Sequence, residues 1–154
     1  MRLMLTIAAL ALAAPTLAAN MSVTAPITAF LNGFNKGDMK AASAPFAKGD
    51  VAIIDEFAPH YWTGPTALAS WAADFGKYAA ANGETDGKVV TGKPTRMEVE
   101  ETAAYVIVPA HYTFKAKGVA MVEDGQMIFA LKGKAKAWKI AAWTWSGPAP
   151  KPAK

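Results

Sequence analysis

The sequence predicts one α+β domain, in which three N-terminal helices pack on a mostly antiparallel sheet. Its 154 residues are the length of a single domain. Apolar residues between positions 24 and 83 recur mainly every three or four residues, which is typical of helices. After Gly83 they alternate with other residues, which is typical of strands. The order of helices followed by strands therefore favours the α+β class.

The first two helices are expected between residues 24 and 46. Thr24 lies near the expected start of the first helix, and Gly37 suits its end. The apolar face of this helix comprises Ile27, Phe30, Leu31 and Phe34. Asp38 can cap the second, short helix, which Pro45 kinks or ends.

A strand is expected in "DVAIIDEF", residues 50–57, and a third helix over residues 63–83. The apolar stripe of this helix comprises Leu68, Trp71, Ala72, Phe75, Tyr78 and Ala79. Asn82 and Gly83 are suitable residues for its end. This helix is therefore expected to bury one aromatic face.

Four further strands are expected before the C-terminus. Their ranges are 87–100, 103–118, 119–133 and 137–146, with turn signals between them. The last residues, 147–154, are rich in proline and lysine. We expect them to form a loose, flexible tail.

The N-terminus, "MRLMLTIAALALAAPTLAAN", has the three regions of a secretory signal peptide. Arg2 precedes an apolar run over residues 3–14, which is too short to span a bilayer. Small residues place the cleavage after Ala18 or Ala19, so residues 1–19 are the signal and 20–146 the domain. The mature chain is expected in a periplasm or outside the cell, without a membrane span. An uncleaved anchor is the alternative interpretation.

Composition restricts the chemistry further. Hydrophobic residues make up 53% of the chain and charged residues 18%, which argues against disorder. Without Arg2, 15 basic residues face 12 acidic ones, and this mild balance predicts no nucleic-acid partner. The chain has no cysteine, so disulfides and thiolate chemistry are excluded. Its two histidines lack a recognised metal-ligand spacing, and no metal or other cofactor is expected.

One long stretch resembles a known family. "AFLNGFNKGDMKAASAPFAKGDVAIIDEF" resembles the opening of the nuclear transport factor 2-like superfamily, which includes SnoaL-like cyclases and ketosteroid isomerases. The shared features are a helix ending in "NKGD", a short helix with a late phenylalanine, and "GDVAIID". The terminal "AWKIAAWTWS" also matches, so the resemblance covers residues 25–146. It implies a cone-shaped fold with a strongly curved sheet, a concave pocket, and a homodimer formed through the sheet face.

The resemblance also assigns candidate catalytic residues. Asp55 resembles the general base of the isomerases, at the end of the first strand. The positions of their two oxyanion donors hold Phe30 and Met127, which argues against a steroid isomerase. Dehydratases and cyclases of the superfamily use an aspartate with a histidine. This implies His60 or His111 as the partner of Asp55 in a cofactor-independent lyase or isomerase.

Each of these residues also has a structural interpretation. Asp55 shares a strand face with Ile53, so it is either a buried acid or one that caps a turn or pairs with a lysine. Glu56 is expected on the other, solvated face. His60 fits a partly exposed loop histidine better than a catalytic one. His111 lies in the pocket if its strand face is concave, and otherwise on the outer or dimer surface.

Large aromatic side chains are the candidates for contacts with a ligand. They are Trp62, Trp71, Tyr78, Tyr112, Trp143 and Trp145. Such residues line pockets for planar or apolar molecules, but they also fill cores and dimer interfaces. Core packing is the favoured interpretation for Trp71.

Three functions remain open at this point. The first is an exported module that binds a small apolar or aromatic molecule in its pocket. The second is a cyclase, dehydratase or isomerase that uses Asp55 with His60 or His111. The third is a non-catalytic dimerisation or accessory domain with a filled pocket. Asp55 near His111 favours the enzyme, whereas an open pocket without paired titratable groups favours the binding module.

Overall fold

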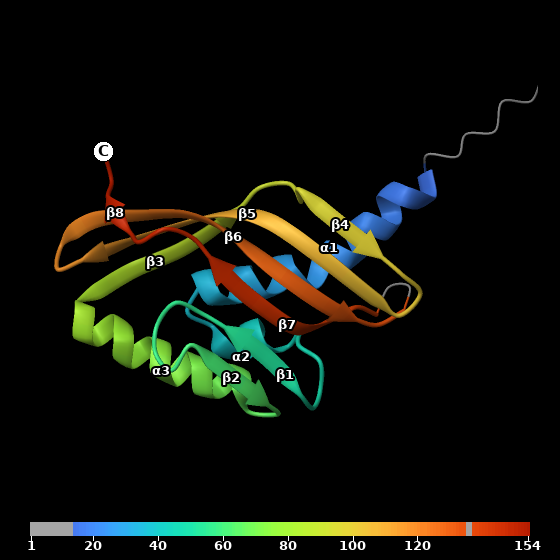
Figure 1. Cartoon of the computed structure of the whole chain (residues 1–154), viewed down its shortest axis with the longest axis horizontal. Coiled ribbons are helices and arrows are strands. Elements are labelled where there is room, and N and C mark those ends of the chain that lie inside the picture. Colours follow the sequence, from blue (N-terminus) through green and yellow to red (C-terminus); the bar gives the residue numbers. More distant parts are fainter. Residues whose placement is uncertain (1–13, 135–136) are drawn as a thin grey trace, which may run out of the picture.

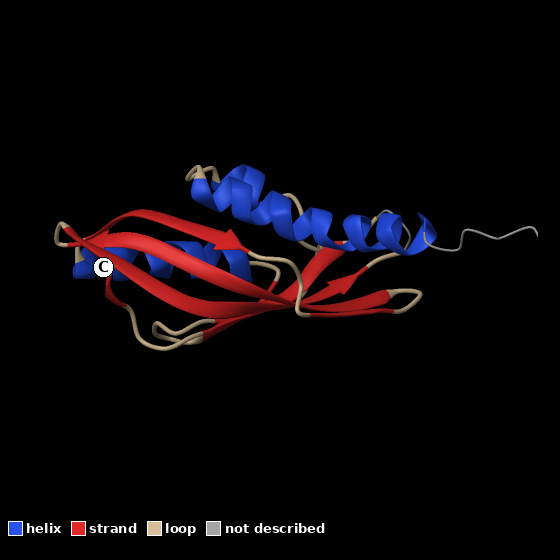
Figure 2. Cartoon of the chain, turned by 90° about the horizontal axis from the view of Figure 1, so that it is seen from above, coloured by secondary structure: helices blue, strands red, loops and turns tan. Residues whose placement is uncertain are grey.

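The structure is a computed structural model that describes residues 14–134 and 137–154. Most of the predicted signal peptide therefore lies outside the described residues. The chain forms three helices, α1 (Ala14–Asn35), α2 (Met39–Ser43) and α3 (Ala67–Asn82). α1 begins well before the expected start at Thr24. Figure 2 shows this long helix lying along one face of the sheet.

The described residues form eight strands in one curved, unclosed sheet, which confirms the α+β prediction (Figure 1). The strands are β1 (Val51–Ile54), β2 (Tyr61–Gly64), β3 (Glu84–Thr91), β4 (Arg96–Val99), β5 (Ala103–Ala116), β6 (Val119–Lys132), β7 (Lys139–Ser146) and β8 (Lys151–Pro152). The main order is β2-β1-β7-β6-β5-β3, while β4 pairs with β5 and β8 with β6. β1 and β7 run parallel, and the other pairs are antiparallel.

Three segments differ from the sequence prediction. Residues 61–64 form β2, which pairs with β1, instead of leading into the third helix. The strand expected over 87–100 is two strands on the same edge of β5, because Gly92 and Pro94 interrupt the pairing. The tail was expected to be loose, and part of it forms β8, where Ala153 donates a backbone hydrogen bond to Ala120 at 2.9 Å.

The connection between α1 and α2 follows the expected signals. Gly37 adopts a φ of 68°, and Asp38 caps α2 by accepting a hydrogen bond from the Ala41 amide at 2.9 Å. At Gly33, a Cβ atom would lie 2.4 Å from the amide nitrogen of Ala42. Only glycine therefore lets α2 pack this closely on α1.

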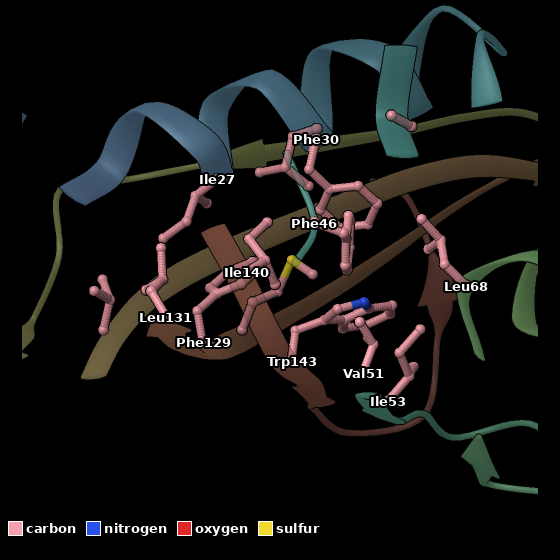
Figure 3. Packing of buried hydrophobic residues seen from close by; sticks show 14 of the residues in the cluster. Ile27, Phe30, Phe46, Val51, Ile53, Leu68, Phe129, Leu131, Ile140 and Trp143 are labelled. Carbon is pink, nitrogen blue, oxygen red and sulfur yellow. The ribbon is translucent and has the colours of Figure 1, made fainter. Parts of the chain in front are cut away.

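The core lies between the helices and the inner face of the sheet (Figure 3). Phe30 of α1 is at its centre, with ring centroids 5.1 Å from Phe46 and 5.7 Å from Trp143 of β7. Ile53, Phe129, Leu131 and Ile140 complete the most buried part of this cluster. Burial of these large side chains is the main source of stability for a chain without disulfides.

Asn35, the last residue of α1, fixes the helix to β3. Its side chain donates to the Val89 carbonyl and accepts from the Val89 amide, both at 2.8 Å. Val89 is buried, so these two hydrogen bonds satisfy backbone groups that water does not reach. They hold the end of α1 beside a cavity that Leu31 and Phe34 help to line.

Candidate functional site

A cavity of about 60 Å³ lies between α1, α3 and the inner face of the sheet. Its walls are mainly aromatic, from Phe30, Phe34, Phe57, Trp71, Phe75, Tyr78, Tyr112, Phe114, Trp143 and Trp145. A neighbouring hollow of about 280 Å³ shares Phe34, Trp71, Phe75, Glu84 and Tyr112 with it. The smaller space has room for a few water molecules or for the head group of a small ligand.

Four carboxyl groups also line the smaller cavity. Asp55 and Glu56 come from the loop between β1 and β2, Glu84 from the start of β3, and Glu123 from β6. No lysine, arginine or histidine lines the cavity within the part of the chain that the structure describes. The site is therefore both apolar and acidic.

Asp55 is held in a fixed orientation. Its Oδ2 accepts a hydrogen bond from Trp71 Nε1 at 2.8 Å, and its Oδ1 accepts one from the Glu56 amide at 2.8 Å. Burial raises the pKa of Asp55 above its usual value, although the hydrogen bond from Trp71 partly offsets this shift. Asp55 is thus a desolvated carboxyl that is oriented toward the cavity, as a general base requires.

Glu123 is the most buried ionisable residue of the site, with an exposed fraction of 1%. Its Oε1 accepts a hydrogen bond from Trp145 Nε1. Its Oε2 is buried and has no hydrogen-bond partner among the described residues. Burial therefore raises the pKa of Glu123.

Glu56 supplies the missing proton. Its carboxyl faces Glu123, and a hydrogen bond between the two carboxyls requires a proton on one of them. Partial burial of the Glu56 carboxyl, followed by the negative charge of Glu123, raises the pKa of Glu56 to about 8. At neutral pH the two glutamates therefore share one proton.

Two tyrosines contribute neutral hydroxyl groups. Burial and the charge of Glu84 raise the pKa values of both Tyr78 and Tyr112. The Tyr112 ring stacks on Phe114 with centroids 4.9 Å apart. A Cβ atom at Gly87 would lie 2.7 Å from the Tyr112 hydroxyl, so glycine at this position leaves room for it. Both hydroxyls stay protonated and can donate hydrogen bonds.

The structure brings together six of the nine residues that were predicted from the sequence. Those that line the cavity are Asp55, Trp71, Tyr78, Tyr112, Trp143 and Trp145. Three others do not line it, namely His60, His111 and Trp62. The predicted aspartate–histidine pair is therefore not assembled at the cavity.

The two histidines lie outside for different reasons. His60 is exposed in the turn between β1 and β2, where its Nδ1 lies 3.3 Å from the main-chain oxygen of Asp55. His111 lies between Tyr112 and Ala110 on β5, both of which point inward, so its own side chain points to the outer face. There its Nδ1 lies 2.6 Å from Asp124 Oδ1, in an exposed pair.

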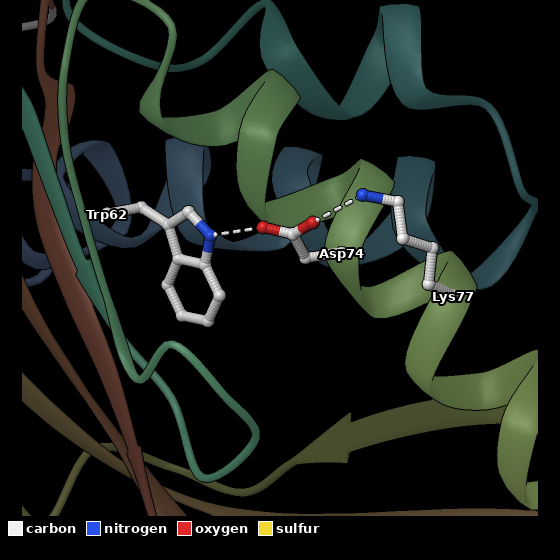
Figure 4. Close-up of polar contacts among 3 residues, drawn as sticks. All are labelled: Trp62, Asp74 and Lys77. Atoms are coloured by element: carbon white, nitrogen blue, oxygen red, sulfur yellow. Dashed lines mark hydrogen bonds and ion pairs between the residues drawn. The ribbon is translucent and has the colours of Figure 1, made fainter.

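Trp62 has a structural contact instead of a place in the cavity (Figure 4). Its Nε1 donates to Asp74 Oδ2 at 3.0 Å, and Asp74 also pairs with Lys77 at 2.9 Å. The hydrogen bond from Trp62 is the main reason why the pKa of Asp74 is lowered. This contact connects β2 to α3.

Sequence reasoning missed three of the four acids. Glu56 was expected to be solvated, and it is exposed, but it also lines the cavity, because β1 already ends at Ile54 and strand alternation does not extend to it. Glu123 had a usable signal, because it is two, four and six residues from Gly125, Met127 and Phe129 on the inner face of β6. Glu84 directly follows the end of α3 and gave no such signal.

Solved structures share this architecture. A ketosteroid isomerase-like protein from Erwinia carotovora atroseptica SCRI1043 has a TM-score of 0.65 and 21% identity, over 84% of this chain and 95% of that chain. A hexachlorocyclohexane dehydrochlorinase, LinA-type3 from Novosphingobium barchaimii LL02, has a TM-score of 0.74 and 12% identity, over 90% and 92%. A nuclear transport factor 2-like superfamily protein from Salmonella enterica serovar Typhimurium LT2 has a TM-score of 0.69 and 18% identity, over 87% and 94%.

The chain has the nuclear transport factor 2-like fold. This confirms the cone-shaped, curved-sheet architecture that the sequence resemblance implied. No family model matches the sequence, and no curated protein matches it. One fold can host many functions, so the residues of the cavity, and not the fold, determine what this chain does.

Two further properties concern the described residues only. No group of three or more histidine, cysteine, aspartate or glutamate side chains among them is arranged to hold a metal ion. No helix in residues 14–134 and 137–154 is long and apolar enough to cross a membrane.

We predict that stability falls as pH rises, and that Glu56→Gln reduces this fall. The pKa of Glu56 is about 8 in the folded chain and near 4.5 in an ordinary glutamate. Between these values the folded chain keeps a proton that the unfolded chain releases, so the free energy of unfolding decreases with rising pH. The solvent exposure of Glu56 limits its share to about 1–2 kcal/mol.

Urea denaturation at pH 5, 7 and 9 measures this effect. Glu100→Gln, at an exposed position in the turn between β4 and β5, is the control and should keep the wild-type pH dependence. An equal loss of stability in Glu56→Gln and wild type would contradict the shared proton.

Proposed function

We propose that this chain binds a small molecule with an aromatic or apolar body in the acidic cavity. The observation that supports this most strongly is the convergence of aromatic walls and a few oriented polar groups on one cavity. Trp71 and Phe75 stack with centroids 5.6 Å apart, and Phe57 stacks on Tyr78 at 5.3 Å. These stacked pairs form preorganised surfaces for another ring.

Indole N–H signals in NMR test this binding directly. With benzyl alcohol as the probe, we expect the signals of Trp71, Trp143 and Trp145 to shift, because these residues line the cavity. Trp62 and Trp138, outside the cavity lining, serve as internal controls. Shifts that are absent or equal for all five signals would contradict binding at the cavity and would favour the accessory-domain alternative.

A matched pair of tyrosine substitutions measures the contribution of the wall. Tyr78→Ala removes a stacking surface and should weaken benzyl alcohol binding by about 3- to 10-fold. Tyr61→Ala removes an exposed tyrosine of β2 and should leave the affinity unchanged. Equal affinities for the two variants would argue against ring stacking in the cavity.

A second candidate function is proton transfer. Asp55 is a desolvated, oriented carboxyl, and it lies in the same cavity as a glutamate pair that holds a proton. Two acids in different protonation states form a base and an acid for a cofactor-independent lyase or isomerase. Glu56 would take the role that was expected for a histidine.

The base role of Asp55 can be tested with 5-nitrobenzisoxazole, whose ring opens when a base removes its C3 proton. We expect wild type to accelerate this reaction and Asp55→Asn to lower the rate at least about 10-fold. Asp50→Asn changes an exposed acid just before β1 and should retain the wild-type rate. A rate that is equal in Asp55→Asn and wild type would rule out Asp55 as the base.

Export is proposed separately from the cavity, on the pattern of residues 1–19 alone. Secretion in a bacterial host should yield a chain that starts at Ala19 or Asn20, as measured by intact mass. A chain that keeps its first residues would contradict a cleaved signal peptide. Homodimerisation stays a prediction from the sequence resemblance.

A further inference from the structure

The charge in the cavity is opposite to the charge of the chain as a whole. The chain carries a formal net charge of +4, so its average field repels cations. Four carboxyls nevertheless line the cavity, and no basic side chain of the described residues lines it. The carboxyl groups of the cavity, and not the net charge of the chain, therefore determine which ligand charge the site favours.

Glu123 gives the acidic site a free hydrogen-bond acceptor for a donor group of a ligand. The residue is 1% exposed and lines the cavity, and Trp145 satisfies only its Oε1. A buried carboxylate oxygen without a donor costs free energy. Oε2 has no hydrogen-bond partner among the described residues, so a donor on a bound molecule would satisfy it.

The aromatic walls suit a positive charge as well as an apolar body. The rings of Trp71, Trp145, Tyr78 and Tyr112 border the same space as the carboxyls. Aromatic faces attract cations, and the attraction is stronger where water is excluded. Acidic and aromatic groups therefore favour the same kind of ligand.

We propose that the ligand of this cavity is a small organic ammonium compound, whose charged head group donates a hydrogen bond to Glu123 Oε2 and displaces the proton shared with Glu56. The head group fits the space of about 60 Å³, and the neighbouring hollow of about 280 Å³ has room for the body. This inference rests on the proposed binding function and specifies the class of ligand.

Other titratable groups around the head group do not replace Glu123 in this role. Asp55 already accepts hydrogen bonds on both oxygens, from Trp71 and from the Glu56 amide. Glu84 lies at the start of β3, and it lines both hollows. Tyr78 of α3 and Tyr112 of β5 are neutral hydroxyls, and His60 is an exposed neighbour of Asp55. In the proposed complex, Glu123 and Glu56 therefore release their shared proton when the ammonium group binds.

Three probes with the same ring test the proposal by calorimetry at pH 7. Benzylammonium, benzyl alcohol and benzoate differ mainly in the charge of the head group. We expect benzylammonium to bind at least about 10-fold more tightly than benzyl alcohol, and benzoate to bind most weakly. Titrations in two buffers with different ionisation enthalpies should also show release of up to one proton per benzylammonium bound.

Variants locate the charged contact. Glu123→Gln keeps the size of the side chain and should lower benzylammonium affinity about 10-fold, while benzyl alcohol affinity stays within about twofold. Glu56→Gln, at a residue that is itself exposed, should abolish the proton release even if Glu123→Gln folds poorly. Glu100→Gln is the exposed control and should bind all three probes as wild type does.

The outcomes separate this inference from the function on which it rests. Benzyl alcohol binding without a preference for benzylammonium would overturn the ammonium proposal and leave the binding function intact. No binding of any probe would overturn both. A benzylammonium preference that survives in both Glu123→Gln and Glu56→Gln would also overturn the proposal. Residues other than these two glutamates would then bind the ammonium group.

Discussion

The chemistry of the site depends on one buried acid, Glu123 of β6. An ionised carboxyl in an apolar interior is costly, so its two oxygens must each find a donor or the group must hold a proton. Trp145 donates to one oxygen, the other has no hydrogen-bond partner among the described residues, and the Glu56 carboxyl interacts with the same group. This requirement makes the two glutamates a single titrating unit, and it makes the cavity receptive to a donor from outside the chain.

The fold creates this situation through strand alternation and sheet curvature. Glu123 points inward because it shares the inner face of β6 with Met127 and Phe129, which are part of the core. The helices cover that face with aromatic side chains and leave a small space where the acids meet. Trp71 connects the apolar core to the acidic groups of the site, since it packs in the core and also donates a hydrogen bond to Asp55.

The sequence predicted the fold well and the site in part. Helical and alternating periods located the three helices and most strands, because both patterns record burial directly. Aromatic candidates such as Trp143 and Tyr112 were found because large rings commonly line pockets, and both of these residues lie in the cavity wall. The face of His111 stayed open in the sequence, because alternation tells which residues share a face but not which face is concave, and the structure places its side chain on the outer face. Glu56 was missed because its orientation depends on where β1 ends.

NMR titration of the side-chain carboxyl carbons of Glu56 and Glu123 tests the central claim most directly. A shared proton predicts that the two groups titrate together, with the later step at about pH 8, and that Glu123→Gln returns the pKa of Glu56 toward that of an ordinary glutamate. Independent titration of both groups near the ordinary glutamate value of 4.5 would contradict it. The cavity would then hold solvated carboxylates without a shared proton.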